Sequence, residues 1–418
     1  MKKLLTATAR LSAVLFFVIA SAGCMKDRLT KTYTLLKPVY MSKTDVLANI
    51  KSNNPQQLKN TGKIYISGRY IFLNEVNKGV HIIDNINPAK PVTVGFINIP
   101  GNIDIAVKGN TLYADLYTDL LAIDISDPMR AKLTKLVPNL FPERSYASGF
   151  FSDSSKVIVD WIQKDTTVDA EPPVGWNGCP NCSMLFSVDR MNGAPNPAAF
   201  VPGIGGSMAR FAVVNDYLYT INLSQLGVLN ISNTSNPEKV STTSVGWNIE
   251  TVYPFKEKLF IGSTTGLFIY DISNGAAPVN EGQFMHARAC DPVVADNDYA
   301  YVTLRSGTFC SGVDNELDVI NIQYSFPSLL KSYPLTNPHG LSKDGNLLFV
   351  CDGKDGLKIY DAAHPTSLQL IKNIRGMETY DVIAWNKKLL VVAKNGLYQY
   401  DYSDVSNIRL LSTIRISR

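Results

Sequence analysis

Gly266-Leu267-Phe268-Ile269-Tyr270-Asp271 is the stretch that decides the fold, because the chain repeats it. Close copies share its apolar run and closing acid: Gly79-Val80-His81-Ile82-Ile83-Asp84, Asp119-Leu120-Leu121-Ala122-Ile123-Asp124, Gly356-Leu357-Lys358-Ile359-Tyr360-Asp361 and Gly396-Leu397-Tyr398-Gln399-Tyr400-Asp401. Weaker copies end at Asp189, Asn230 and Asn321. The closing residues at 84, 124, 189, 230, 271, 321, 361 and 401 are 40 or 41 residues apart, except for two longer gaps that indicate insertions.

Each copy lies within a unit of four short apolar runs, which the second unit places at residues 104–107, 111–115, 120–124 and 133–137. Runs of β-branched and aromatic residues between Gly, Asn, Asp and Pro turns predict antiparallel strands. A four-stranded unit cannot bury both faces alone, so neighbouring units must stack. We therefore expect an all-β propeller with eight blades, at about residues 62–101, 102–142, 143–206, 207–247, 248–287, 288–336, 337–377 and 378–418. Seven blades are expected if the divergent third unit is a decorated loop.

The closing Asp or Asn of each third strand has two interpretations. Its side chain can accept hydrogen bonds from backbone amides and set the turn into the fourth strand. Metal ligation is the other interpretation, but the exchange of Asp for Asn between copies suits a turn better.

Residues 79–88, 120–128, 266–272 and 356–361 resemble LVIVD repeats, a propeller-forming unit of bacterial surface and secreted proteins. The resemblance extends over about residues 62–418 and implies the fold, with no catalytic set to carry over.

The N-terminus reads as a bacterial lipoprotein signal, with Lys2 and Lys3 before an apolar run and small residues before Cys24. We expect residues 1–23 to be removed and Cys24 to be lipidated, since two or three acyl chains anchor a protein stably. Met25 lacks the acid that commonly retains such proteins in the inner membrane, which favours the outer membrane. An ordinary cleaved signal is the alternative.

Residues 24–61 should form the lipidated cysteine, a polar tether around residues 25–36 and a lead-in, with a short capped helix near residues 42–50. The formal net charge is +4, and loss of Lys2, Lys3 and Arg10 with the signal leaves +1. This balance gives no electrostatic footprint for nucleic acid.

The chain has five cysteines after Cys24, and we expect them to lie in an oxidising compartment outside the cytoplasm. Cys179 and Cys182 lie in a Pro- and Gly-rich insertion, where a small disulfide is expected and exposed redox chemistry or metal capture stays open. Cys290 and Cys310 fall near one end of the sixth unit, which predicts a second disulfide. Cys351 reads as a buried strand thiol.

Polar residues fall at equivalent positions where the first strands of several units begin and should face the central channel. Such a ring could hold a Ca²⁺ ion or a polar ligand, although a polar, water-filled channel mouth would look the same. The candidate ligand-binding residues are Glu250, Asp291, His339 and Asp381, with Asp104 and Arg210 one residue further on. No catalytic motif is recognisable, so we assign no catalytic residue, no fixed metal site and no other cofactor.

The function that these features favour is a lipid-anchored cell-envelope binding module. Insertions at residues 163–183 and 305–315 would contact a protein, glycan or peptidoglycan partner at the propeller rim. One alternative is a hydrolase or lactonase-like enzyme with a metal in the central channel. Another is a periplasmic assembly factor.

Overall fold

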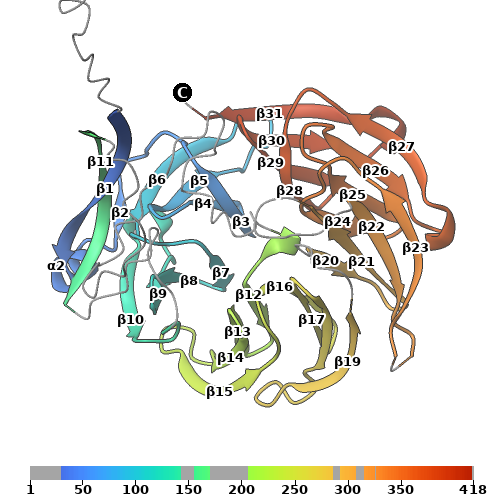
Figure 1. Cartoon of the computed structure of the whole chain (residues 1–418), viewed down its shortest axis with the longest axis horizontal. Helices are drawn as coiled ribbons and strands as arrows, with labels where there is room; N and C mark the ends of the chain where they lie inside the picture. The colour runs from blue at the N-terminus through green and yellow to red at the C-terminus, as the bar shows by residue number, and fades with distance from the viewer. Residues whose placement is uncertain are drawn as a thin grey trace, which may run out of the picture. The chain divides into compact units, whose positions relative to one another are not determined.

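The computed structural model describes residues 30–142, 155–169, 206–285, 292–306, 315–324 and 326–416. Within these residues, seven four-stranded antiparallel meanders form a ring, one of them with a short additional strand. Figure 1 shows the innermost strands around a common centre, with the last blade next to the first. The predicted all-β propeller is therefore confirmed, and the blade number is seven.

The blades are numbered in chain order, and their strands run from the innermost to the outermost. Blade 1 contains β3 (Thr61–Ser67), β4 (Tyr70–Glu75), β5 (Gly79–Asp84) and β6 (Val92–Asn98), with β2 (Ser52–Asn53) paired outside β6. Blade 2 contains β7 (Ile105–Lys108), β8 (Thr111–Leu116), β9 (Asp119–Asp124) and β10 (Lys132–Val137). Blade 3 contains β12 (Phe211–Val214), β13 (Tyr217–Asn222), β14 (Gln225–Asn230) and β15 (Glu238–Ser244).

The remaining blades have the same plan. Blade 4 contains β16 (Ile249–Phe255), β17 (Lys258–Ser263), β18 (Gly266–Asp271) and β19 (Val279–Met285). Blade 5 contains β20 (Val293–Ala295), β21 (Tyr299–Leu304), β22 (Glu316–Asn321) and β23 (Ser328–Pro334). Blade 6 contains β24 (Leu341–Asp344), β25 (Leu347–Cys351), β26 (Leu357–Asp361) and β27 (Gln369–Ile374). Blade 7 contains β28 (Thr379–Trp385), β29 (Lys388–Ala393), β30 (Gly396–Asp401) and β31 (Arg409–Arg415).

Burial explains why the middle strands are the most apolar. All six residues of β8 are buried, whereas no residue of the outermost strand β19 is buried. The hydrophobic clusters each combine side chains from two neighbouring blades, so the core is a series of interfaces around the ring. Every blade also shifts register between its third and fourth strands, which bends the outer strand and increases its twist.

The closing residue of each third strand makes the predicted turn. Its side-chain oxygen accepts a hydrogen bond from the backbone amide two residues later, as Asp271 Oδ1 does from Ser273 at 3.0 Å. The same contact recurs in all seven blades, from Asp84, Asp124, Asn230, Asp271, Asn321, Asp361 and Asp401. Carboxylate and amide side chains do this equally well, which explains their exchange between copies.

The ring closes through side chains, because every four-stranded meander consists of consecutive strands. Leu390 and Leu397 of blade 7 pack in one cluster with Ile71 and Ile83 of blade 1. The amides of Asn85 and Gln399 exchange two hydrogen bonds across this interface, at 3.0 and 2.8 Å. The joint between the first and last blades therefore resembles the other interfaces.

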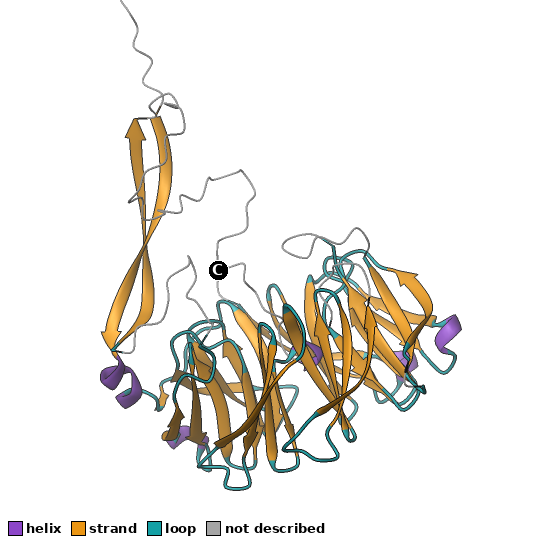
Figure 2. Ribbon diagram, turned by 60° about the horizontal axis from the view of Figure 1, so that its bottom comes forward, coloured by secondary structure: helices purple, strands orange, loops and turns teal. Residues whose placement is uncertain are grey.

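The predicted third blade, residues 143–206, is where the expectation of eight blades is wrong. The strand described there is β11 (Lys156–Asp169), and it pairs with β1 (Thr30–Ser42) in a separate two-stranded sheet. Figure 2 shows these two strands as a long twisted pair. The physical reason is that residues 30–42 supply β11 with an apolar and β-branched partner strand, so β11 joins no four-stranded meander. Asp189, the expected closing residue, lies outside the described residues.

The lead-in to blade 1 differs in part from the expectation. Residues 30–36, expected in a polar tether, belong to β1, where Thr34 Oγ1 donates to Asp165 Oδ1 of β11 at 2.7 Å. The expected short helix is present as α2 (Lys43–Ala48), and Ser42 caps it by accepting the Asp45 amide at 3.1 Å. Single 3₁₀ turns complete the helices: η1 (Pro128–Arg130), η3 (Gly206–Met208), η4 (Pro365–Ser367) and η5 (Val405–Asn407). None of the helices in the described residues is long and apolar enough to cross a membrane.

Candidate functional site

The five described candidates lie where the innermost strands begin. Asp104, Arg210 and His339 stand one or two residues before β7, β12 and β24, while Glu250 and Asp381 lie within β16 and β28. The register differs from the predicted one, however: Asp381 pairs with Val392 as Thr251 pairs with Gly262, so Asp381 is level with Thr251 and not with Glu250. The role of these residues in ligand binding stays a prediction. Asp291 lies outside the described residues, as do Cys24 and the predicted disulfide cysteines Cys179, Cys182, Cys290 and Cys310.

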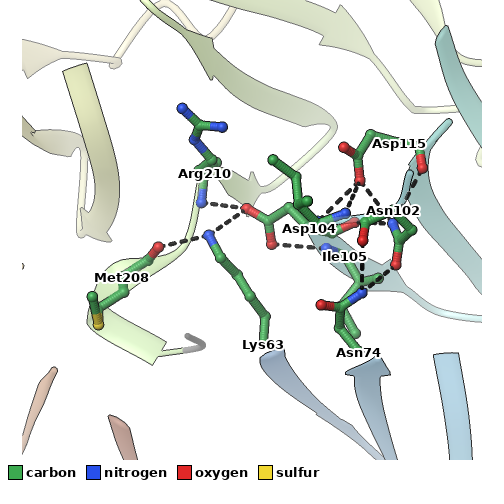
Figure 3. Close-up of polar contacts among 9 residues, drawn as sticks. Lys63, Asn74, Asn102, Asp104, Ile105, Asp115, Met208 and Arg210 are labelled. Carbon is green, nitrogen blue, oxygen red and sulfur yellow. Dashed lines mark hydrogen bonds and ion pairs between the residues drawn. The ribbon is translucent and has the colours of Figure 1, made fainter. Parts of the chain in front are cut away.

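Asp104 is the acceptor of a buried ion pair that the sequence analysis missed (Figure 3). Its Oδ2 accepts from Lys63 Nζ of β3 at 2.9 Å and also from the backbone amide of Arg210. Both side chains are almost fully buried, with exposed fractions of 2% for Lys63 and 1% for Asp104. Burial lowers the pKa of Lys63 to about 8, and the adjacent Asp104 carboxylate opposes that shift. The pair joins blades 1 and 2, and the Arg210 amide adds the start of blade 3.

Asp115, near the C-terminal end of β8, holds Asp104 in position. Its Oδ1 accepts the backbone amides of Ile103 and Asp104, both at 2.9 Å, and the Asn102 side chain at 2.7 Å. Asn102 in turn accepts from Asn74 of blade 1 at 2.6 Å, as Figure 3 shows. A comparable contact recurs in blades 1 and 6, where an acid at the end of the second strand accepts backbone amides of the segment that leads into the first strand. These acids are Glu75, the last residue of β4, and Asp352, which follows β25. An acid at the end of the second strand was the available sequence signal.

Residues 206–209, which we call the central plug, occupy the middle of the ring. The plug contains η3, which contacts the innermost strands β3, β16, β20, β24 and β28. Its Met208 carbonyl accepts from Lys63 Nζ at 2.6 Å. Ser207 Oγ accepts from the Leu341 amide at 2.8 Å, and the Ala209 carbonyl accepts from the Val252 amide at 2.7 Å. The plug is thus fastened to blades 1, 4 and 6.

Asp381 is buried against the plug without a partner. Its exposed fraction is 0%, and neither carboxylate oxygen has a hydrogen-bond partner of good geometry among the described residues. A Cβ atom at Gly340 would lie 1.9 Å from Asp381 Oδ1, and one at Gly206 would lie 2.9 Å from Oδ2, so both positions require glycine. Burial raises the pKa of Asp381 well above its usual range, and the Val382 amide and the Lys63 ammonium oppose this only in part.

His339 is committed to contacts within the protein. Arg305, which follows β21, places its Nη1 atom 3.1 Å from His339 Nδ1, and a guanidinium can only donate. Burial and the nearby Arg305 charge lower the pKa of His339 to about 3. For the half-buried Glu250, burial raises the pKa overall, and the nearby Arg210 and Arg305 charges oppose that shift only in part. His339 is therefore a neutral acceptor, and Arg305 is a channel residue that the sequence analysis did not include.

Among the described residues, which do not include Asp291 of the possible cation ring, no group of three or more His, Cys, Asp or Glu side chains is suited to a metal ion. Cys351 is confirmed as a buried free thiol in β25, and burial raises its pKa well above the usual range. The chemistry-bearing side chains of the channel mouth thus contact cations, backbone amides or the plug.

A cavity of about 390 Å³ lies next to the plug, along the innermost strands of blades 1, 2, 3, 4, 6 and 7. The plug residues Gly206, Ser207 and Ala209 line one end. Pro254 and Trp385, at the far ends of β16 and β28, line the other end. Trp385 is 43% exposed, so this end reaches the surface of the ring.

Comparison with known proteins supports the fold. The LVIVD repeat profile matches residues 59–98, 102–135, 205–243, 259–286 and 340–375. No curated protein matches the chain.

Solved structures share the architecture at low sequence identity. The computationally designed Ika8 protein is 8% identical, with a TM-score of 0.52 over 87% of this chain and 88% of its own. Sqt1 from Saccharomyces cerevisiae is 8% identical, with a TM-score of 0.51 over 88% of both chains. BamB from Moraxella catarrhalis is 11% identical, with a TM-score of 0.50 over 86% of this chain and 97% of its own. At this identity the likeness concerns the fold alone. The chain is therefore a seven-bladed β-propeller that carries LVIVD repeats.

Proposed function

We propose that this protein is a lipid-anchored binding module of the bacterial cell envelope, which captures a protein partner at the rim of its ring. One observation carries the proposal: the basic side chains Lys63 and His339 at the channel mouth are already hydrogen-bonded within the protein. Lys63 pairs with Asp104 at 2.9 Å, and His339 accepts from Arg305 at 3.1 Å. A general base or a nucleophile needs a free, reachable lone pair, and neither Asp104 nor His339 offers one, because their polar atoms are already hydrogen-bonded to described residues.

Exposed aromatic side chains on blade 5 support a partner at the rim. Tyr324 and Phe326, in the turn between β22 and β23, are 71% and 88% exposed, and Leu329 of β23 is 46% exposed. We call these three residues the rim patch. Tyrosine and phenylalanine are enriched in protein interfaces, because they bury a large apolar area and lose little conformational freedom. The blade beneath them is held by a buried core, so the patch has a fixed support.

The test uses the full-length lipidated protein, extracted in detergent and immobilised, to capture proteins from an envelope extract. A variant with Tyr324→Ser and Phe326→Ser should lose at least tenfold of the captured species. Leu370→Ser, at a 53% exposed position on the outer strand of blade 6, is the matched control and should retain them. Equal capture by both variants would contradict a rim partner, and capture abolished by a soluble glycan would indicate a carbohydrate instead.

The membrane anchor rests on residues 1–24 and has its own test. Cys24→Ala should abolish incorporation of radiolabelled palmitate and release the protein from the membrane fraction, because cysteine supplies the acylated thiol. Protease added to intact cells then separates a surface location from a periplasmic one. Unchanged palmitate incorporation in Cys24→Ala would contradict the anchor while leaving rim capture untouched.

A further inference from the structure

The central cavity has the size and shape of a ligand pocket. Its volume of about 390 Å³ falls within the range of roughly 300–1,000 Å³ that small-molecule sites occupy. An apolar cavity of about 150 Å³ already accommodates benzene, so this one has room for two or three such rings. It is closed at one end by the plug and reaches the surface near Trp385.

The walls of the cavity are mainly apolar. They come from the innermost strands of separate blades, and the large side chains among them are Tyr65, Phe211, Tyr253, Leu341, Ile383 and Trp385. Water beside these side chains finds few hydrogen-bond partners, and apolar cavities remain dry or bind apolar molecules. The walls therefore favour an apolar occupant over a column of water.

The charged groups that line the cavity are all neutralised by partners within the protein. Lys63 and Asp104 pair with each other at 2.9 Å, at the end next to the plug. Lys343, the other charged lining residue, pairs with Asp296 at 2.8 Å and donates to the Gly345 carbonyl at 2.6 Å. A charged ligand would enter without a free counter-charge and would lose its hydration. The cavity should therefore discriminate against ions.

A few polar groups remain that could orient a neutral molecule. Ser207 and Ser342 line the cavity, and each hydroxyl oxygen accepts one backbone amide, from Leu341 at 2.8 Å and from Ala384 at 3.0 Å. A hydroxyl can still donate its proton when its oxygen accepts one hydrogen bond. The innermost strands are also sheet edges, which present backbone polar groups to the channel.

We propose that the centre of the ring binds a small, uncharged and mainly apolar molecule, about the size of two or three aromatic rings, between the plug and Trp385. This site is independent of the rim patch, which lies on the outer part of blade 5. The inference therefore goes beyond the proposed capture of a protein partner.

The experiment titrates the full-length protein with N-phenyl-1-naphthylamine, an uncharged fluorescent probe of two linked aromatic groups. The full-length protein should show one saturable site, with a fluorescence rise that an excess of a second neutral aromatic compound reverses. The anionic relative 8-anilinonaphthalene-1-sulfonate should bind at least tenfold more weakly, because each lysine among the described lining residues is already paired with a carboxylate.

Two cavity variants locate the site. Val213→Trp fills the cavity from β12 and should weaken binding of the neutral probe at least tenfold. Val240→Trp, at a 45% exposed position on β15 of the same blade, is the matched control and should bind normally. Ala384→Phe, from the opposite wall, is the second variant if the first one misfolds by circular dichroism.

Three results would overturn the proposal: no saturable site, equal or tighter binding of the sulfonate, or full binding by a folded cavity variant. Rim capture by the Val213→Trp protein should stay unchanged. Loss of probe binding with retained capture is therefore distinct from failure of the proposed function.

Discussion

Replacing Asp381 by asparagine tests the most unusual group in the ring, a carboxylic acid that is fully buried and unpaired among the described residues. Asparagine has nearly the same shape and carries no charge, so the glycine backbone of Gly206 and Gly340 can still pack against it. Burial raises the pKa of Asp381 well above its usual range. The folded protein therefore keeps this proton at pH values where the unfolded chain has lost it.

The sign and size of the effect follow from linkage. Below about pH 4, both states of the wild type hold the proton, and Asp381 contributes nothing to the pH dependence. Above that pH, the unfolded chain releases the proton first, and the unfolding free energy of the wild type falls by about 1.4 kcal/mol per pH unit. The fall ends when the pH passes the folded pKa. Because Asp381→Asn lacks this loss, its stability relative to the wild type should grow as the pH rises above 4, by up to about 1.4 kcal/mol per pH unit until the pH passes the folded pKa.

The assay is urea unfolding of both proteins at pH 4, 5 and 6, followed by circular dichroism. Asp401→Asn is the control, because the Ser403 hydroxyl and amide lower the pKa of Asp401 to about 2 and its linkage falls below this window. Its stability difference from the wild type should stay constant from pH 4 to pH 6. A constant or shrinking difference for Asp381→Asn would refute the view that the folded ring holds a neutral acid beside the plug.

Three further changes test the ring. Leu390→Ala in the interface between blades 7 and 1 should lower the unfolding free energy by about 2–5 kcal/mol, as measured by urea unfolding. The control Leu410→Ala, at a 54% exposed position, should lower it by less than about 1 kcal/mol. Equal losses would contradict closure of the ring by packing. Asp361→Ala should lower the melting temperature, because it removes the side-chain oxygen that accepts the Ala363 amide in the turn. Asp361→Asn should leave the melting temperature unchanged, since asparagine occupies this position in two other blades. A lower melting temperature in both variants would mean that the charge of Asp361 matters. Lys63→Met should lower the unfolding free energy by about 3–5 kcal/mol, because it leaves Asp104 buried without its cation. Adding Asp104→Asn should recover part of that loss. Additive losses in a double-mutant cycle would argue against coupling of the two residues.

Much of the fold could be predicted because its signals are local. The apolar run closed by Asp or Asn fixes the third strand and its turn within a few residues, as the contact from Asp271 to the Ser273 amide shows. Strand alternation and turn residues place the neighbouring strands, and the same pattern places Cys351 in a buried position. The start of each first strand follows from the repeat, so the placement of Asp104, His339 and Asp381 near such a start was predictable too.

The contacts of these side chains were not predictable, because they depend on distant parts of the chain. The blade number depends on β11, which pairs with β1 more than one hundred residues earlier. The plug at residues 206–209 contacts the innermost strands of five blades, and its Gly206 lies against Asp381. Lys63 and Arg305 become partners of Asp104 and His339 only because consecutive blades pack face to face.

The sequence by itself therefore determined the repeating four-stranded unit and its turns, because these rest on hydrogen bonds and side-chain alternation between near neighbours. Only the tertiary structure decided the number of blades, the partners of the channel residues and the closed end of the cavity. These depend on which surfaces meet when the ring closes, and a local pattern does not specify that choice.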